Sequence, residues 1–124
     1  MAASLSRVIL YVQDVDRLSV FYREVFGFGV VEEIAGEWAV LEAGACQLAL
    51  HRVGEAYRGK PAMGTSNAKL VLTIEAPLAA TREALLARGV AMGEIKSYPG
   101  LTGPLCDGRD PEGNVFQLSE TTAT

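Results

Sequence analysis

Side chains that bind metals or form disulfides are scarce in this sequence. It has one histidine, His51, and two cysteines, Cys46 and Cys106, among 124 residues. The cysteines form neither a C-x-x-C pair nor a zinc-ligand spacing, and two are too few for a disulfide scaffold. One imidazole cannot build a multi-histidine metal site. We therefore expect both cysteines to be free thiols of a cytoplasmic protein.

Long apolar runs and basic clusters are also missing. The longest apolar run, Val8–Val12, is far too short to span a bilayer. Residues Met1–Ser6 carry no charged segment followed by a long apolar stretch, so no signal peptide is predicted. The formal net charge is −4, and no run of lysines or arginines offers the basic stripe that phosphate binding needs. We expect neither a membrane nor a nucleic acid among its partners.

The remaining composition is that of a small globular protein. Hydrophobic residues make up 49% of the chain and charged residues 21%, which is typical of a folded domain rather than a disordered segment. The length suits one domain that can bury a substantial core.

The first half of the chain predicts a strand, a helix and three further strands. Leu18, Tyr22 and Phe26 belong to one apolar helical face, either Asp14 or Asp16 can cap its start, and Gly27 suits its end. The strands are expected at Arg7–Gln13, Phe28–Ile34, Trp38–Glu42 and Gln47–Arg52.

The second half repeats this order after an aperiodic segment, Val53–Asn67, that is rich in glycine and polar residues. Pro77 suits the first turn of the second helix and Gly89 its end. The strands are expected at Lys69–Glu75, Met92–Ser97, Leu105–Arg109 and Val115–Glu120, with a frayed tail at Thr121–Thr124.

The two halves are therefore an internal repeat. Lys69 lies 62 positions after Arg7, and Gly89 lies 62 positions after Gly27. We expect one α+β domain over residues 1–124, with module 1 at about 5–52, a linker at 53–67 and module 2 at about 68–120.

The last strand follows a tight polar turn, Asp110–Asn114. Pro111 suits the first central turn position, and Gly113 and Asn114 both tolerate positive φ. Alternation along the strand then places Gln117 in the middle of one face, where its amide must find partners.

This chain resembles the glyoxalase / bleomycin resistance protein / extradiol dioxygenase family, the vicinal oxygen chelate superfamily. The residues that carry the resemblance are Val8–Asp14, Phe21–Tyr22, Val25–Phe28 and Asp110–Asn114. The resemblance implies two βαβββ modules whose curled mixed sheets surround a cavity. It also implies a homodimer with sites shared between chains, although modules that pair within one chain remain an alternative.

Metal-dependent members of that family place ligands at positions that the resemblance carries over to Arg7, Ala49, Lys69 and Gln117. Divalent ions need anionic oxygens or neutral imidazoles, whereas here two positions are cations, one has no donor and one is a neutral amide. We therefore expect no metal and no cofactor at the usual place.

The candidate ligand-binding residues follow from strand alternation, which places one face of each central strand toward the cavity. Those chosen from this face are Arg7, Ile9, Tyr11, Ala49, His51, Lys69, Val71 and Gln117. Trp38 is added as a candidate stacking surface for a planar ligand.

Each candidate also has a structural interpretation. Arg7 and Lys69 can hold a ligand anion, or point to solvent or pair with Glu32, Glu37 or Glu75.

For the uncharged candidates, Gln117 can bond a ligand or a neighbour such as Lys69, and Trp38 can stack on a ligand or fill the core. His51 can act in acid–base catalysis or lie at the rim of the cavity. Glu42 and Glu120 are expected on solvent faces.

The function expected from these features is binding of a partly aromatic small molecule that can carry an anionic group, without a metal; drug sequestration is one use of such a cavity. The alternative is an enzyme of the same superfamily, a lyase, isomerase or dioxygenase with non-standard site residues. The sequence leaves open whether the chain catalyses a reaction.

Overall fold

The computed structural model describes residues 1–60, 66–100 and 103–120. The predicted frayed tail, Thr121–Thr124, and part of the predicted linker lie outside these ranges. Contacts divide the chain into unit 1, residues Met1–Met63, and unit 2, residues Gly64–Thr124.

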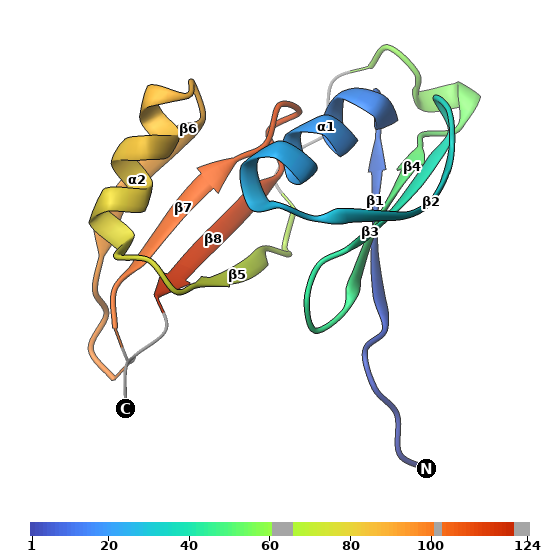
Figure 1. Ribbon diagram of the computed structural model, residues 1–124. Coiled ribbons are helices and arrows are strands. Elements are labelled where there is room, and N and C mark those ends of the chain that lie inside the picture. Colours follow the sequence, from blue (N-terminus) through green and yellow to red (C-terminus); the bar gives the residue numbers. More distant parts are fainter. Residues whose placement is uncertain (61–65, 101–102, 121–124) are drawn as a thin grey trace. The chain divides into compact units, whose positions relative to one another are not determined.

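Unit 1 is a four-stranded mixed sheet with one helix (Figure 1). The strand order is β1-β4-β3-β2, with β1 parallel to β4 and the other neighbours antiparallel. Its elements are β1 (Arg7–Val12), α1 (Val15–Phe26), β2 (Gly29–Ile34), β3 (Trp38–Glu42) and β4 (Gln47–Arg52). The predicted order of strand, helix and three strands is confirmed.

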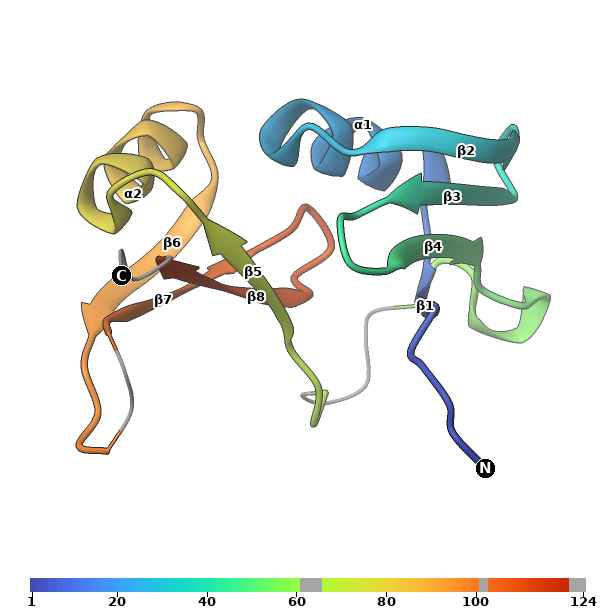
Figure 2. The same cartoon turned by 60° about the horizontal axis from the view of Figure 1, so that its bottom comes forward.

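Unit 2 repeats this topology (Figure 2). The strand order is β5-β8-β7-β6, and again the first strand is parallel to the last. Its elements are β5 (Leu70–Ile74), α2 (Leu78–Ala87), β6 (Ala91–Lys96), β7 (Leu105–Arg109) and β8 (Val115–Glu120). Both units are therefore the predicted βαβββ modules, each with an open mixed sheet.

Helix α1 begins and ends where its sequence signals lie. The Asp14 carboxylate accepts a hydrogen bond from the Arg17 backbone N–H at 3.0 Å, so Asp14 is the cap and Asp16 lies in the first turn. Gly27 ends the helix at φ 73°, a conformation that a β-carbon disfavours. Leu18 and Tyr22 are fully buried where the helix packs on β3 and β4.

Each helix covers one face of its sheet, and the other face carries polar, aromatic and aliphatic side chains. In β1, Val8, Leu10 and Val12 are the more buried residues, and Arg7, Ile9 and Tyr11 alternate with them on the other face. In unit 2 the buried hydrophobic residues are Leu78, Leu85, Val90, Cys106, Phe116 and Leu118. Alternation therefore places Asp107 and Gln117 on the face of their sheet opposite the core.

The first part of the predicted linker is attached to unit 1. It contains a short 3₁₀ helix, Glu55–Tyr57. The Gln13 amide donates to the carbonyl oxygens of Tyr57 and Lys60 at 2.9 and 3.2 Å, and its Oε1 accepts from the Gly59 N–H at 2.8 Å. One side chain thus fixes the segment that follows β4.

The Asp110–Asn114 turn is held by the buried Asp110 carboxylate. The Gly113 N–H donates to the Asp110 carbonyl at 2.9 Å, which places Pro111 at the first central position as predicted. Gly113 has φ 86°, but among the described residues only glycines have positive φ, so Asn114 does not use that conformation. Asn114 instead donates through its backbone and side chain to Asp110.

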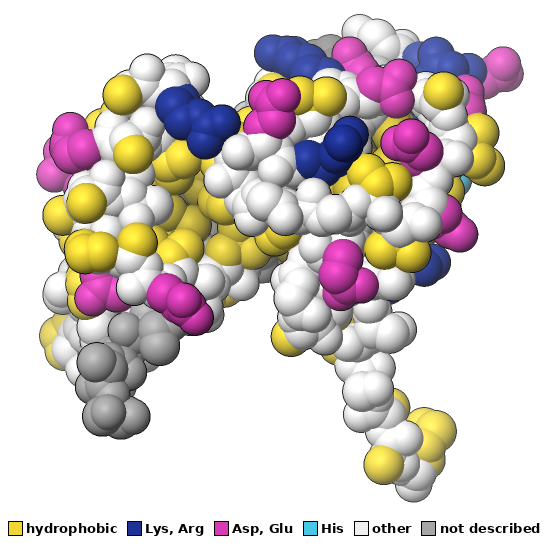
Figure 3. All heavy atoms as spheres, viewed as in Figure 1, with side chains coloured by type: hydrophobic (Ala, Val, Ile, Leu, Met, Phe, Trp, Pro, Cys, Tyr) yellow, Lys and Arg dark blue, Asp and Glu magenta, His cyan; other side chains and the backbone are white. Residues whose placement is uncertain are grey.

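No helix in the described ranges is long and apolar enough to cross a membrane. On the face seen in Figure 3, basic side chains (dark blue) and acidic side chains (magenta) are interspersed over unit 1.

Candidate functional site

The hairpin of β7 and β8 brings a carboxylate and an amide together in unit 2. Asp107 is the register partner of Gln117, and the turn at Asp110–Asn114 fixes that register. The Gln117 Nε2 donates to Asp107 Oδ1 at 3.0 Å. Lys69, just before β5, donates through Nζ to Asp107 Oδ2 at 2.7 Å. The result is a lysine–aspartate–glutamine cluster on the face of the sheet opposite the core.

Asp107 is ionised in this cluster over the whole physiological pH range. Partial burial works against the charged carboxylate, but hydrogen bonds from Lys69 and Gln117 and the positive charges of Lys69 and Lys96 outweigh it. The pKa of Asp107 is therefore lowered from its ordinary value of 3.8.

A pocket of about 540 Å³ opens over this cluster, within the usual range for small-molecule sites. Lys69, Lys96 and Arg109 supply positive charge to its wall, and Glu94 and Asp107 supply negative charge. The remaining lining residues are Ser66, Ala91, Met92, Gly93, Tyr98, Leu105, Gly108, Val115 and Gln117. The pocket thus carries one net positive charge in a chain whose formal charge is −4.

Two of the three candidates predicted in unit 2, Lys69 and Gln117, line this pocket. Val71 pairs in register with Gln117 and is 58% exposed, but it is not part of the pocket wall. Lys69 and Gln117 both take Asp107 as their partner, rather than Glu75 or each other. Sequence reasoning missed Asp107, although counting back from the turn pairs it with Gln117.

The six candidates predicted in unit 1 share the sheet face opposite α1. Strand β1 contributes Arg7, Ile9 and Tyr11, which pair in register with Gln47, Ala49 and His51 of β4, and Trp38 of β3 pairs with His51. Ala49 is fully buried, whereas Ile9 and Tyr11 are exposed. The structure thus brings these six residues to one surface.

Arg7 and Trp38 form an interacting pair on this surface. The Arg7 guanidinium donates through Nε and Nη2 to Gln47 Oε1 at 3.1 and 2.9 Å, and its Cζ lies 5.6 Å from the Trp38 ring centre. Trp38 Nε1 donates to Glu32 Oε1 at 3.0 Å. Arg7 therefore has neither Glu32 nor Glu37 as a salt-bridge partner within the described residues, and Trp38 is half-buried on the sheet surface rather than in the core.

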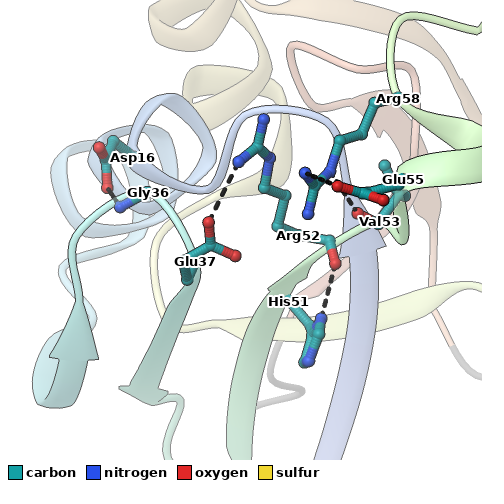
Figure 4. A network of polar contacts seen from close by, with 8 residues as sticks. All are labelled: Asp16, Gly36, Glu37, His51, Arg52, Val53, Glu55 and Arg58. Carbon is teal, nitrogen blue, oxygen red and sulfur yellow. Dashed lines mark hydrogen bonds and ion pairs between the residues drawn. The ribbon is translucent and has the colours of Figure 1, made fainter.

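His51 is held by one ring nitrogen and two aromatic neighbours. Its Nδ1 lies 2.7 Å from the Arg52 carbonyl oxygen (Figure 4), which can only accept, so Nδ1 carries a proton. In the neutral ring, Nε2 then holds the lone pair. The Tyr11 and Trp38 rings lie 5.2 and 5.6 Å from the imidazole centre. Arg52 itself pairs with Glu37 at 3.1 Å.

The residues present do not fit a divalent metal ion. Within each unit, no three His, Cys, Asp or Glu side chains of the described ranges lie close enough to share an ion. At the positions carried over from metal-dependent proteins, Arg7 and Lys69 are cations that would repel one. Lys69 already places a positive charge beside the Asp107 carboxylate.

Glu120 has a structural role that the sequence did not predict. It was expected on a solvent face, but it is half-buried, and its Oε1 accepts a hydrogen bond from the Leu78 backbone N–H at 2.6 Å. Helix α2 begins after Pro77, which has no capping side chain, so β8 supplies the cap. Glu42 is exposed, as expected.

Nearly the whole chain is similar to known proteins in sequence pattern and in fold. Residues 7–119 match the family model described as a glyoxalase-like domain. A lactoylglutathione lyase from Agrobacterium tumefaciens superposes with a TM-score of 0.75 at 19% identity, covering 97% of this chain and 95% of that one.

Two further solved structures are similar. A variant of the fosfomycin resistance protein FosX from Listeria monocytogenes, solved with Mn(II) and 1S,2S-dihydroxypropylphosphonic acid, gives a TM-score of 0.79 at 16% identity, covering 98% and 93%. A protein from the mobile metagenome of V. pseudocholerae superposes with a TM-score of 0.70 at 26% identity, covering 99% of this chain and 98% of that one.

Proposed function

Because the chain belongs to the glyoxalase-like domain family, we propose that it binds a small, partly aromatic, anionic organic molecule without a resident metal ion. The observation that carries this proposal is the pocket of unit 2, in which Lys69, Lys96 and Arg109 outnumber Glu94 and Asp107. The match to the family supports a small-molecule role, and the cationic residues at metal-ligand positions favour binding without a metal.

The apolar part of the pocket supports an aromatic component in the ligand. Tyr98, Leu105 and Val115 line it beside the charged groups, so one portion of a ligand can contact apolar surface while another meets the cations. In unit 1, Trp38 and Tyr11 offer a second aromatic surface on the sheet face opposite α1.

A ligand screen with matched lysine variants tests this function. The chain has three lysines, and Lys69 and Lys96 line the pocket whereas Lys60 does not. Thermal shifts would be measured against planar and peptidic antibiotics, small aromatic acids and fosfomycin, the last because one structural neighbour is a fosfomycin resistance protein. Hits would be titrated calorimetrically into wild type, Lys96→Met and Lys60→Met.

We expect the screen to find anionic ligands. Their affinity should fall about tenfold in Lys96→Met and stay unchanged in Lys60→Met. A screen without hits, or hits that bind both variants equally, would contradict the proposed site.

We also propose that the chain acts as a homodimer in the cytoplasm. Exposed apolar side chains on the sheet faces opposite the helices, among them Ile9, Tyr11 and Val71, support self-association. Free thiols at Cys46 and Cys106 support a reducing compartment. Size-exclusion chromatography with a mass measurement at micromolar concentration should give twice the mass of one chain. The mass of a single chain would contradict the dimer.

A second candidate is a metal-free lyase or isomerase of the same superfamily, and His51 is the observation that favours it. Its proton on Nδ1 leaves Nε2 as a base with a fixed orientation. Turnover of a methylglyoxal–thiol adduct that disappears in His51→Ala would rank this enzyme above the binding protein. Absent turnover, or turnover unchanged by the substitution, would exclude His51 as its base.

A further inference from the structure

We propose that the unit 2 pocket recognises a monocarboxylate with a neighbouring hydroxyl group, such as an aromatic hydroxy acid. The carboxylate lies between the Lys69 and Lys96 ammonium groups, and the hydroxyl donates to Gln117 Oε1. This inference rests on the proposed binding function and names its ligand class. It follows from the donors, the acceptor and the charge that the pocket leaves open.

The open donors are the two ammonium groups. Lys69 Nζ has three N–H bonds and, within the described residues, donates one of them, to Asp107. Lys96 lines the same pocket with neither a hydrogen bond nor an ion pair to any described residue. Both lysines line this pocket, and Lys96 pairs in register with Leu105, which lies two residues before Asp107 in β7. Two ammonium groups with unused donors make a site for an oxyanion.

The open acceptor is the side-chain carbonyl of Gln117. An ionised carboxylate can only accept hydrogen bonds, so the amide must turn its Nε2 toward Asp107. The Gln117 Oε1 is thereby fixed as an acceptor, and no described residue donates to it. A ligand that completes this group needs a hydroxyl or amine donor beside its anionic group.

The charge balance selects a monoanion. Three cations, Lys69, Lys96 and Arg109, face two carboxylates, Glu94 and Asp107, which leaves one positive charge. One carboxylate neutralises the pocket, whereas a doubly charged phosphate or phosphonate would leave an unpaired negative charge. A monoanion therefore matches the net charge of the pocket wall.

Asp107 has a positioning role in this arrangement. It holds the Lys69 ammonium at 2.7 Å and the Gln117 amide at 3.0 Å, so one side chain orients both the donor and the acceptor. Replacing Asp107 by asparagine keeps an oxygen acceptor but removes the charge that holds Lys69. Ligand selectivity for the hydroxyl should therefore weaken together with affinity.

The test is a calorimetric comparison of four related compounds. Phenyllactate carries the carboxylate and the hydroxyl, phenylpropionate lacks the hydroxyl, phenyllactamide lacks the charge, and the phosphonate analogue of phenyllactate carries the larger charge. Each would be titrated into wild type, Lys69→Met, Lys96→Met, Gln117→Leu and the control Lys60→Met, all checked for folding by circular dichroism.

We expect phenyllactate to bind about tenfold more tightly than each of the other three compounds. Lys69→Met and Lys96→Met should each lower the affinity for phenyllactate about tenfold, and Lys60→Met should leave it unchanged. Gln117→Leu should bind phenyllactate no more tightly than phenylpropionate. Equal binding of phenyllactamide, tighter binding of the phosphonate, or unchanged affinity in Lys96→Met would overturn the inference.

Failure of the two proposals can be told apart. If neutral aromatic compounds bind in the pocket and the acids do not, the binding function stands and the carboxylate inference is wrong. If none of the four compounds binds wild type at millimolar concentration, the carboxylate inference is equally overturned, and the broader ligand screen alone decides the binding function.

Discussion

Replacing Asp110 by alanine should destabilise the chain by about 3 kcal/mol, because this side chain supports the turn that sets the β7–β8 register. Asp110 is 4% exposed. Its Oδ1 accepts from the Glu112 N–H at 3.0 Å, the Asn114 N–H at 2.9 Å and Asn114 Nδ2 at 3.1 Å, and its Oδ2 accepts from Asn114 Nδ2 at 2.9 Å. Alanine leaves two backbone N–H groups without that acceptor. At roughly 1–1.5 kcal/mol for each, with the side-chain contact added, the sum reaches this estimate.

The matched substitution Asp110→Asn separates hydrogen bonding from charge. Asparagine keeps one carbonyl oxygen for the two backbone donors, so it should cost about 1 kcal/mol. Glu83→Ala, at a side chain that is 73% exposed, serves as a surface control with little effect. Urea unfolding followed by circular dichroism gives the three free energies. An Asp110→Ala protein within about 0.5 kcal/mol of wild type would refute this account of the turn.

Three other predictions concern Gly108, the two cysteines and Asp107. Gly108→Ala should lower the free energy of unfolding in urea by about 1–3 kcal/mol. The added β-carbon would come within 2.6 Å of both Met92 Sδ and the Phe116 ring. Unchanged stability would contradict this prediction and show that the core can rearrange there. A thiol reagent at mildly alkaline pH should label Cys46 well before Cys106, since burial raises the pKa of the Cys106 thiol by more than Arg82 lowers it; equal labelling rates would contradict this. The lowered pKa of Asp107 means that its ionised form stabilises the fold at pH values above the ordinary pKa of 3.8, and that this contribution is lost as the pH falls through the lower pKa of the folded chain. The difference in unfolding midpoint between wild type and Asp107→Asn should therefore vanish in acid. A difference that grows as the pH falls would contradict the stabilising role of the ionised Asp107.

Local signals in the sequence were sufficient to predict the two α-helices and the eight strands of the described ranges, but not the 3₁₀ helix at Glu55–Tyr57. The Asp14 cap, the Gly27 stop and the period-two alternation of β1 each act within a few residues of chain, so neighbouring letters reveal them. The repeat showed that the order of strand, helix and three strands occurs twice, whereas the pairing of these strands in mixed sheets was implied by the family resemblance.

The site was only partly predictable, because its contacts depend on register and on tertiary proximity. Lys69 and Gln117 were found by position, but their common partner, Asp107, becomes visible only when β7 is paired with β8. Glu120 caps a helix that begins 42 residues earlier, and no local pattern marks that contact. Asn114 tolerates positive φ as a residue type, yet here it serves as a hydrogen-bond donor to the turn.

The central claim is that this glyoxalase-like domain holds an anionic ligand with its own lysines instead of a metal ion. Calorimetric titration of phenyllactate before and after treatment of the protein with EDTA tests it most directly. The account predicts the same Kd in both titrations and a loss of about tenfold in Lys96→Met. Binding that disappears with EDTA and returns with added Mn²⁺ or Zn²⁺ would contradict it.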